Sequence, residues 1–439
     1  MLHKLAIINY FYVKLIKMLH LNPKLILSIA FLVSTCILAS CSKSGGDPTP
    51  PKTDPPALIV SSINVNEGPF NTLVEITGTG FSTTLTDDKV FFNDKEGIVK
   101  TATATKLTAT VPVGAGSGII KVTVNGKTIV GPSFTYLLTP VTTTIAGSGT
   151  AGANDADGTL ASFNGPIGIV IDNDGNLYVA DSKNNKIRKI STTGTVSTFA
   201  GSGTAGLVNG IGAVACFNHP DALTIDNAGN IYVADELNHV IRKITPTASV
   251  STFAGSGAYG LTNGSLTLAT FKNPTGISID GLGNFYVADP QNNVIRKIDN
   301  TGMVSTFAGN SISALTDGTG TAASFNLPVS VATDKNGNVF VADLLNQRIR
   351  KITPAAVVTT VATTGVRNTT FDGIDAISLD AAGNLYVSAN SSLIKVNKDN
   401  VTNLVAGGLA DAEGHVVDKS GNIFIADTRN NKILKISLQ

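Results

Sequence analysis

The sequence of 439 residues has no tryptophan and only three cysteines, and 14% of its residues are charged. Cys36 and Cys41 lie in an apolar N-terminal stretch and Cys216 stands alone in the remainder, so we expect no framework of intrachain disulfides. A stripe rich in Lys and Arg is missing, which argues against nucleic acid as a partner. Helical periodicity is missing from residues 141–439, so we expect no α-helical or α/β architecture there.

Recognisable catalytic motifs are also missing. Two of the five histidines, His3 and His20, lie in the N-terminal stretch. There is no H-E-x-x-H, no G-x-S-x-G and no cysteine–histidine spacing typical of a metal site. We therefore expect a protein that is not an enzyme, with no cofactor and no bound metal.

What the sequence does have is a short motif that recurs six times. It reads GNLYVAD at 175–181, and close variants follow at 229–235, 283–289, 337–343, 383–389 and 421–427. Each copy has one apolar run before it and two after it, rich in Val, Ile, Tyr, Phe and Thr and separated by turns. Four strands per unit, repeated at this spacing, predict the antiparallel blades of a β-propeller.

The number of strands predicts how the ring closes. Outer strands and innermost strands each occur six times. The repeat region, however, begins with an outer strand at 141–147 (VTTTIAG) and ends after a third strand at 432–436 (KILKI). Pairing these two segments removes the exposed edges that an open ring would leave. We predict a six-bladed propeller whose last blade combines one N-terminal strand with three C-terminal strands.

The repeated motifs resemble a known family. The segments D-x-x-G-N, (Y/F)VAD and N-x-x-I-(R/K)-K-I are similar to the NHL repeat, and the resemblance covers residues 141–439. The fifth copy departs from the pattern, with Ala389 where the other copies have Asp. The resemblance implies a six-bladed propeller, a fold that commonly serves as a protein-interaction module.

Residues 57–137 form a separate unit. Short strands alternate there with Gly, Pro and Asn turns, which predicts an immunoglobulin-like β-sandwich. The motifs V-E-I-T-G-T-G-F, L-T-A-T-V-P and a final F-T-Y are similar to the IPT/TIG family. The resemblance implies a spacer or an interaction module, and we expect a spacer.

Residues 1–40 resemble a bacterial lipoprotein signal peptide. Lysines precede the apolar run LILSIAFLVSTCILAS at 25–40, which ends directly before Cys41. This run is shorter than the ~20 residues that span a bilayer, which disfavours the alternative of a transmembrane anchor. The resemblance implies lipidation of Cys41, a Pro-rich tether over 41–56, and attachment to the outer membrane of a Gram-negative bacterium, facing the periplasm or the cell surface.

Three residue types recur once per blade, and we expect them to be structural. Asp181 and its equivalents are expected to accept backbone N–H groups of the Asn-rich turn that follows. Phe163 and its equivalents are expected to fill the space between blades. Arg188 and its equivalents are expected to be packed or paired on the third strand.

Candidate ligand-binding residues are those that break the repeat. Three carboxylates, Asp221, Asp375 and Glu413, stand at aligned positions at the start of inner strands, which places them near the mouth of the central channel. His415 replaces an aliphatic residue of the other copies, and Tyr259 is an aromatic outside the repeat pattern in a long blade-to-blade loop. These loops are long before the first four blades and short before the last two, which predicts one built-up, lopsided face.

We therefore expect a non-catalytic surface lipoprotein whose propeller loop face binds a protein or a glycan. A broad apolar patch on that face would favour a protein. A cleft with an exposed tyrosine would favour a glycan, specifically one handled by a polysaccharide uptake system, although sugar sites usually use Trp or Tyr and Trp is absent. A propeller hydrolase or lyase with a central metal is a second alternative.

Overall fold

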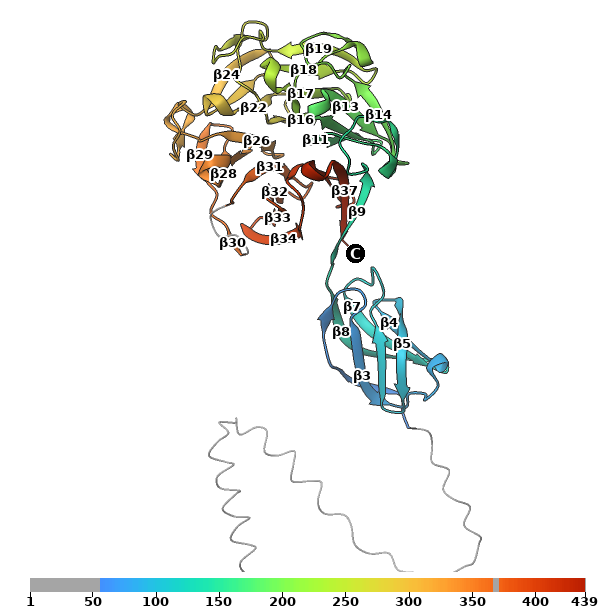
Figure 1. Cartoon of the computed structure of the whole chain (residues 1–439). Coiled ribbons are helices and arrows are strands. Elements are labelled where there is room, and N and C mark those ends of the chain that lie inside the picture. Colours follow the sequence, from blue (N-terminus) through green and yellow to red (C-terminus); the bar gives the residue numbers. More distant parts are fainter. Residues whose placement is uncertain (1–55, 366–370, 439) are drawn as a thin grey trace, which may run out of the picture. The chain divides into compact units, whose positions relative to one another are not determined.

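A computed structural model of the chain describes residues 56–365 and 371–438. This part consists of strands, turns and single-turn 3-10 helices, and it contains no helix that is long and apolar enough to cross a membrane. The signal peptide, Cys41 and almost all of the tether fall outside the described residues, so their assignments stay predictions. Two all-β parts follow along the chain, one built from strands β1 to β8 and one from strands β9 to β37 (Figure 1).

The first part is the immunoglobulin-like sandwich that its alternating pattern predicts. Strand β3 shows the alternation directly, since every second residue from Val74 is buried. Buried residues of five strands share one core, in which the rings of Phe92 and Phe134 meet edge to face at 5.3 Å. The strands run in the order β1-β3-β6-β5-β4-β7-β8-β2. Their bounds are β1 Ile59–Ile63, β2 Glu67–Gly68, β3 Leu73–Thr79, β4 Asp88–Phe92, β5 Lys95–Thr103, β6 Lys106–Thr110, β7 Gly118–Val124 and β8 Lys127–Tyr136.

The second part is a ring of six antiparallel sheets, as the repeat predicts (Figure 1). In blade 1, β11 (Pro166–Ile171) is innermost, followed by β12 (Leu177–Asp181), β13 (Lys186–Ile190) and β14 (Thr195–Ala200). The same four strands are β16 Pro220–Ile225, β17 Ile231–Asp235, β18 Val240–Ile244 and β19 Ser249–Ala254 in blade 2; β21 Ile277–Ile279, β22 Phe285–Asp289, β23 Val294–Ile298 and β24 Met303–Ala308 in blade 3; β26 Pro328–Thr333, β27 Val339–Asp343, β28 Arg348–Ile352 and β29 Val357–Thr360 in blade 4; and β31 Ile374–Leu379, β32 Leu385–Ala389, β33 Ser392–Val396 and β34 Val401–Gly407 in blade 5.

Blade 6 closes the ring as predicted. Its strands β35 (Ala412–Val417), β36 (Ile423–Asp427) and β37 (Lys432–Leu438) come from the C-terminal end of the chain, and its outer strand β9 (Pro140–Ala146) comes from the start of the propeller. Strands β37 and β9 pair antiparallel from Ile433 opposite Ala146 to Leu438 opposite Pro140. The ladder joins the two ends of the propeller, so β37 does not present an unpaired edge and the ring is closed.

Part of each long blade-to-blade loop lies at the outer edge of a blade, which the sequence did not predict. Each runs outward and adds a two-residue strand to the outer edge of the blade it leads into, such as β10 (Ala156–Asp157) beside β14. These strands shield outer edges that would otherwise present unpaired backbone groups. The corresponding strands are β15 Gly210–Ile211, β20 Gly264–Ser265, β25 Gly318–Thr319 and, in parallel orientation, β30 Thr364–Gly365.

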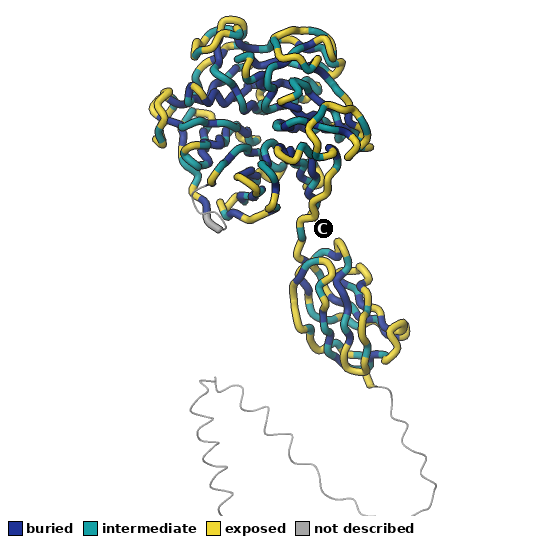
Figure 2. The backbone as a smooth tube through the Cα atoms, in the orientation of Figure 1, coloured by how far each residue is buried: buried dark blue, intermediate teal, exposed yellow. Residues whose placement is uncertain are grey.

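The hydrophobic core of the propeller lies between blades rather than within them. One core cluster combines Tyr178 and Ile187 of blade 1 with Leu223 and Ile231 of blade 2, closed by Phe217 from the connecting loop. Phe163, Phe217, Phe271 and Phe325 are all fully buried, which confirms their role as fillers between blades. Figure 2 shows the buried residues along the strands and the exposed ones along the outer turns.

A buried ion pair supports each of the first four blades. In blade 1, Arg188 and Asp181 are both fully buried, with Arg188 Nη1 2.8 Å from Asp181 Oδ2. The guanidinium lies 5.2 Å from the ring centroid of Phe163. Asp181 Oδ1 accepts the backbone N–H of Asn164 at 2.7 Å, and its other oxygen accepts the Asn184 side chain.

This arrangement confirms that the recurrent Asp and Arg are structural, but it corrects the expected donor. The backbone N–H belongs to the loop that precedes the inner strand, and the turn after Asp181 contributes only the Asn184 side chain. The same pair recurs as Asp235–Arg242, Asp289–Arg296 and Asp343–Arg350. Blade 5 has Ala389 and Ile394 at these positions, and blade 6 has Asp427 and Leu434.

We predict that removing the Asp of this pair lowers the stability of the protein more than removing the Arg. Asp289→Ala would leave Arg296 buried without a carboxylate, and arginine cannot lose its charge, so the free energy of unfolding should fall by roughly 3–5 kcal/mol. Arg296→Leu recreates the combination of blade 6 and leaves a carboxyl that can take up a proton, so it should cost clearly less. Calorimetric melting of the two variants checks the order, and a lower melting temperature for Arg296→Leu would contradict it.

Candidate functional site

The six inner strands surround a central cavity of about 220 Å³. Its lining includes the residue that was aligned from each blade in the sequence, and three of these are Asp221, Asp375 and Glu413. The acids come from blades 2, 5 and 6, and the structure brings all three to one cavity. The remaining aligned positions are Ile167, Thr275 and Val329.

Local backbone geometry explains why these acids reach the cavity. The pairing of the first two strands is irregular at the start of β16, β31 and β35, between Pro220 and Leu223, Ile374 and Ala376, and Ala412 and His415. Such irregularities re-aim a side chain out of the regular alternation of a strand. Asp221, Asp375 and Glu413 each lie inside one of them.

The three carboxyls hold their protons more tightly than usual. Burial, followed by the charges of Asp375 and Asp411, raises the pKa of Glu413 to about 8. Burial and the charge of Asp411 raise the pKa of Asp375 to about 7. Burial, then the charges of Glu413 and Glu236, raises the pKa of Asp221 well above its usual range. Near neutral pH the cavity therefore contains protonated and ionised carboxyls together, an environment that favours a cation or a polar ligand.

His415 contacts blade 5 with both ring nitrogens. Nε2 donates to the backbone carbonyl of Tyr386 at 3.0 Å, and Nδ1 lies 2.9 Å from the Ser388 hydroxyl. Burial lowers the pKa of the imidazole, so the ring is neutral in this interface. His415 borders the cavity, but its ring nitrogens are engaged in packing blade 6 against blade 5.

Tyr259 lies apart from the cavity. It belongs to the loop between blades 2 and 3 and is 56% exposed. The His239 ring contacts it edge-on at 5.1 Å, and Lys272 Nζ lies 4.9 Å from its ring centroid. The structure thus brings Asp221, Asp375 and Glu413 together in the cavity. His415 borders the same cavity with its ring nitrogens bound to blade 5, and Tyr259 lies apart from all four.

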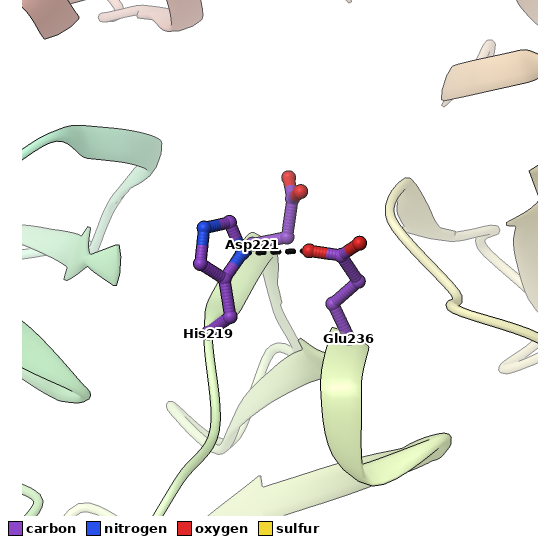
Figure 3. Close-up of side chains that lie close together, drawn as sticks. All are labelled: His219, Asp221 and Glu236. Carbon is purple, nitrogen blue, oxygen red and sulfur yellow. Dashed lines mark ion pairs between the residues drawn. The ribbon is translucent and has the colours of Figure 1, made fainter. Parts of the chain in front are cut away.

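Two polar residues beside Asp221 were missed in the sequence. His219 Nδ1 lies 2.6 Å from Glu236 Oε2 at the edge of blade 2 (Figure 3). Both break the repeat in the same way as Asp221. The position of His219 is Gly, Asn or Leu in blades 1, 3 and 4, and that of Glu236 is Ser, Pro or Leu. The criterion that found Asp221 would have found them if it had been applied to the neighbouring loops.

A second, larger cavity of about 800 Å³ lies between blades 4 and 5, at the opposite ends of the strands. Val361 lines it, at a position where blades 1 to 3 carry Phe199, Phe253 and Phe307. The smaller side chain leaves a groove where the other blades are filled. This groove contains no group of carboxyls with shifted pKa values, so the central cavity is the stronger candidate site.

We predict that Glu413→Gln stabilises the protein at alkaline pH. The folded protein holds the Glu413 proton with a pKa of about 8, against an ordinary value of 4.5, so this contribution to stability is present below pH ~4.5 and is lost as the pH rises to 8. The variant should be more stable than the wild type by roughly 3–5 kcal/mol at pH 8.5 and equally stable near pH ~4. Melting temperatures at both pH values check this, with the exposed Glu67→Gln as control. Equal stability, or a loss, at pH 8.5 would contradict the prediction.

Comparison with known proteins agrees with both parts of the fold. The NHL repeat family matches residues 163–190, and the IPT/TIG domain family matches residues 58–149. Human NHL repeat-containing protein 2 is 36% identical over 177 residues, which is 36% of this chain and 24% of that protein. Suppressor of Quenching 1, chloroplastic, of Arabidopsis thaliana is 36% identical over 149 residues, which is 31% of this chain and 14% of that protein. The chain thus spans a quarter or less of the length of these relatives.

Solved structures show the same fold over most of the chain. A Bacteroides thetaiotaomicron protein of unknown function aligns with a TM-score of 0.55 at 17% identity, covering 88% of this chain and 99% of that one. An auxiliary nutrient binding protein from Bacteroides ovatus aligns with a TM-score of 0.51 at 15% identity, with the same coverage. The chain thus combines an N-terminal region that matches the IPT/TIG domain family with a six-bladed β-propeller whose first blade matches the NHL repeat.

Proposed function

We propose that the protein is a non-catalytic lipoprotein of the outer membrane, anchored through Cys41, and that its propeller binds a protein partner through the blade-to-blade loops. The sequence supports the anchor through the apolar run that ends at Cys41. The absence of catalytic motifs from the sequence supports a binding role.

The observation that carries this proposal is a row of exposed apolar side chains on successive loops. Leu207, Leu261 and Leu315 occupy the same position in the loops before blades 2, 3 and 4, and they are 43%, 36% and 45% exposed. Tyr259 and Ile312 on the same loops are also exposed. We call these five residues the loop apolar row.

Neighbouring loops of this row lie against each other. A Cβ at Gly257 would be 3.4 Å from Leu207 Cδ2, which is van der Waals distance between the loops before blades 2 and 3. Apolar side chains that recur on adjacent loops of a rigid ring form a surface suited to a protein partner. Leucine rows are less suited to sugars, which stack on aromatic rings.

A surface glycan is the second candidate, and Tyr259 favours it. Its exposed ring, flanked by Lys272 and His239, offers a platform on which a sugar could stack. The solved structure from Bacteroides ovatus is described as that of an auxiliary nutrient binding protein, which is compatible with this candidate through the shared fold alone.

The two candidates predict different effects of mutation. We expect cross-linking on intact cells to capture a protein partner. We expect Leu207→Ser with Leu315→Ser to weaken binding of that partner by about thirtyfold or more, since each buried leucine contributes roughly 1–2 kcal/mol at an interface. The matched control is Leu160→Ser with Leu268→Ser, two exposed leucines of the outer loop segments.

A polysaccharide panel completes the test with residues 44–439 in soluble form. Saturable binding that Tyr259→Ala abolishes and the leucine pair does not would overturn the protein partner in favour of the glycan. Equal capture by the wild type and the leucine variant would also contradict the protein-binding role of the loop apolar row.

A further inference from the structure

Three side chains of blade 2 converge at the edge of the central cavity. His219 is the last loop residue before β16, Asp221 lies within β16, and Glu236 begins the 3-10 helix Glu236–Asn238 directly after β17. One nitrogen and one oxygen of each carboxylate lie within 4.8 Å of one another (Figure 3). This set is distinct from the three cavity carboxyls, with which it shares only Asp221.

The strand ladder of blade 2 brings these residues together. Pro220 of β16 pairs with Asp235 of β17. The residues on either side of Pro220 are His219 and Asp221, and the residue after Asp235 is Glu236. The backbone N–H of Glu236 also donates to the carbonyl of His219 at 3.3 Å. Three ligand-type side chains at these positions are therefore neighbours as a result of the blade architecture itself.

Adjacent blades hold the backbone and one side chain of the set in place. His219 has a left-handed backbone (φ 59°), and its N–H donates to Asn185 of blade 1 at 2.9 Å. Glu236 Oε1 accepts the side-chain amide of Asn273, which leads into blade 3, at 3.2 Å. Outer contacts of this kind orient the ligands of metal sites and leave the other carboxylate oxygen free to bind.

The inward-facing atoms lie in surroundings that favour a positive ion. His219 Nδ1 is buried, and its 2.6 Å approach to Glu236 Oε2 requires a proton on that nitrogen, whose place a metal ion can take. Asp221 faces the charges of Glu236 and Glu413, and only burial and these like charges act on its pKa, which rises. A positive ion among these groups would offset these like charges.

We propose that His219 Nδ1, Asp221 and Glu236 bind one divalent metal ion of the Zn²⁺ or Mn²⁺ class. Imidazole together with carboxylate suits these ions, whereas Ca²⁺ requires six to eight oxygen ligands. Ligands of a tetrahedral ion lie about 3.4 Å apart when each is ~2.1 Å from it. Side-chain rotations that move the ligand atoms by about 1 Å would therefore bring them to these distances. Three protein ligands leave a coordination position open for an oxygen donor from solvent or from a ligand.

The test is titration of Zn²⁺ and Mn²⁺ into the EDTA-treated protein, residues 44–439, by isothermal calorimetry. We expect one ion per chain with micromolar affinity for at least one metal, together with a rise in melting temperature that grows with metal concentration. The chain itself supplies conservative replacements, because blade 3 carries Asn and Thr at the positions of His219 and Asp221, and blade 1 carries Ser at that of Glu236.

We expect His219→Asn, Asp221→Thr and Glu236→Ser each to weaken binding by about tenfold or more. The control is Asp399→Asn, which removes an exposed carboxylate in the turn between β33 and β34 of blade 5 and should leave the affinity unchanged. Circular dichroism without metal confirms that each variant is folded. Absence of saturable binding to the wild type, or equal affinity in the wild type and the three variants, would overturn the proposal and leave His219 and Glu236 as a simple ion pair.

Discussion

The propeller depends on one buried ion pair that is built four times. Each Asp at the end of a second strand binds an Arg of the third strand and the backbone of the loop arriving from the previous blade. The pair therefore ties each blade to the loop that arrives from the blade before it, and the phenylalanine beside the guanidinium fills the space between the blades. Charges removed from water require partners, and each guanidinium finds them through Nη1 and Nη2, whereas its Nε is buried without a hydrogen bond.

The recurrent packing between blades allows the residues that line the central cavity to differ from blade to blade. Because packing between blades is fixed by recurrent residues, the first residues of the inner strands can vary without loss of the fold. Three of them are acids placed by breaks in strand pairing, and burial together with the charges of neighbouring carboxylates raises their pKa values. Polar chemistry is thus concentrated on blades 2, 5 and 6, while the exposed leucines lie on the loops before blades 2 to 4.

Much of the fold and part of the candidate site were predictable from the sequence, because six aligned copies of the repeat show which positions recur and which vary. Blade number, the closing strand, the structural Asp, Arg and Phe, and the grouping of Asp221, Asp375 and Glu413 all follow from aligned positions. Three features did not follow. The path of the long loops along the outer edges depends on two-residue strands too short to leave a pattern. The engagement of His415 depends on Ser388 in another blade. His219 and Glu236 meet Asp221 through a ladder pair, Pro220 with Asp235, that no local pattern encodes.

The closing ladder also sets the order of events during synthesis. Strand β9 is made first among the propeller strands and its ladder partner β37 last, so β9 has no native strand partner until the whole ring has been translated. Contacts between such distant segments form slowly, and an unpaired strand is open to wrong partners in the meantime. The threonines at 142–144 keep β9 polar before β37 is available, and its short length limits the unpaired backbone that it exposes. The final pairing is thus the step at which six blades, already packed against their neighbours, become a closed ring.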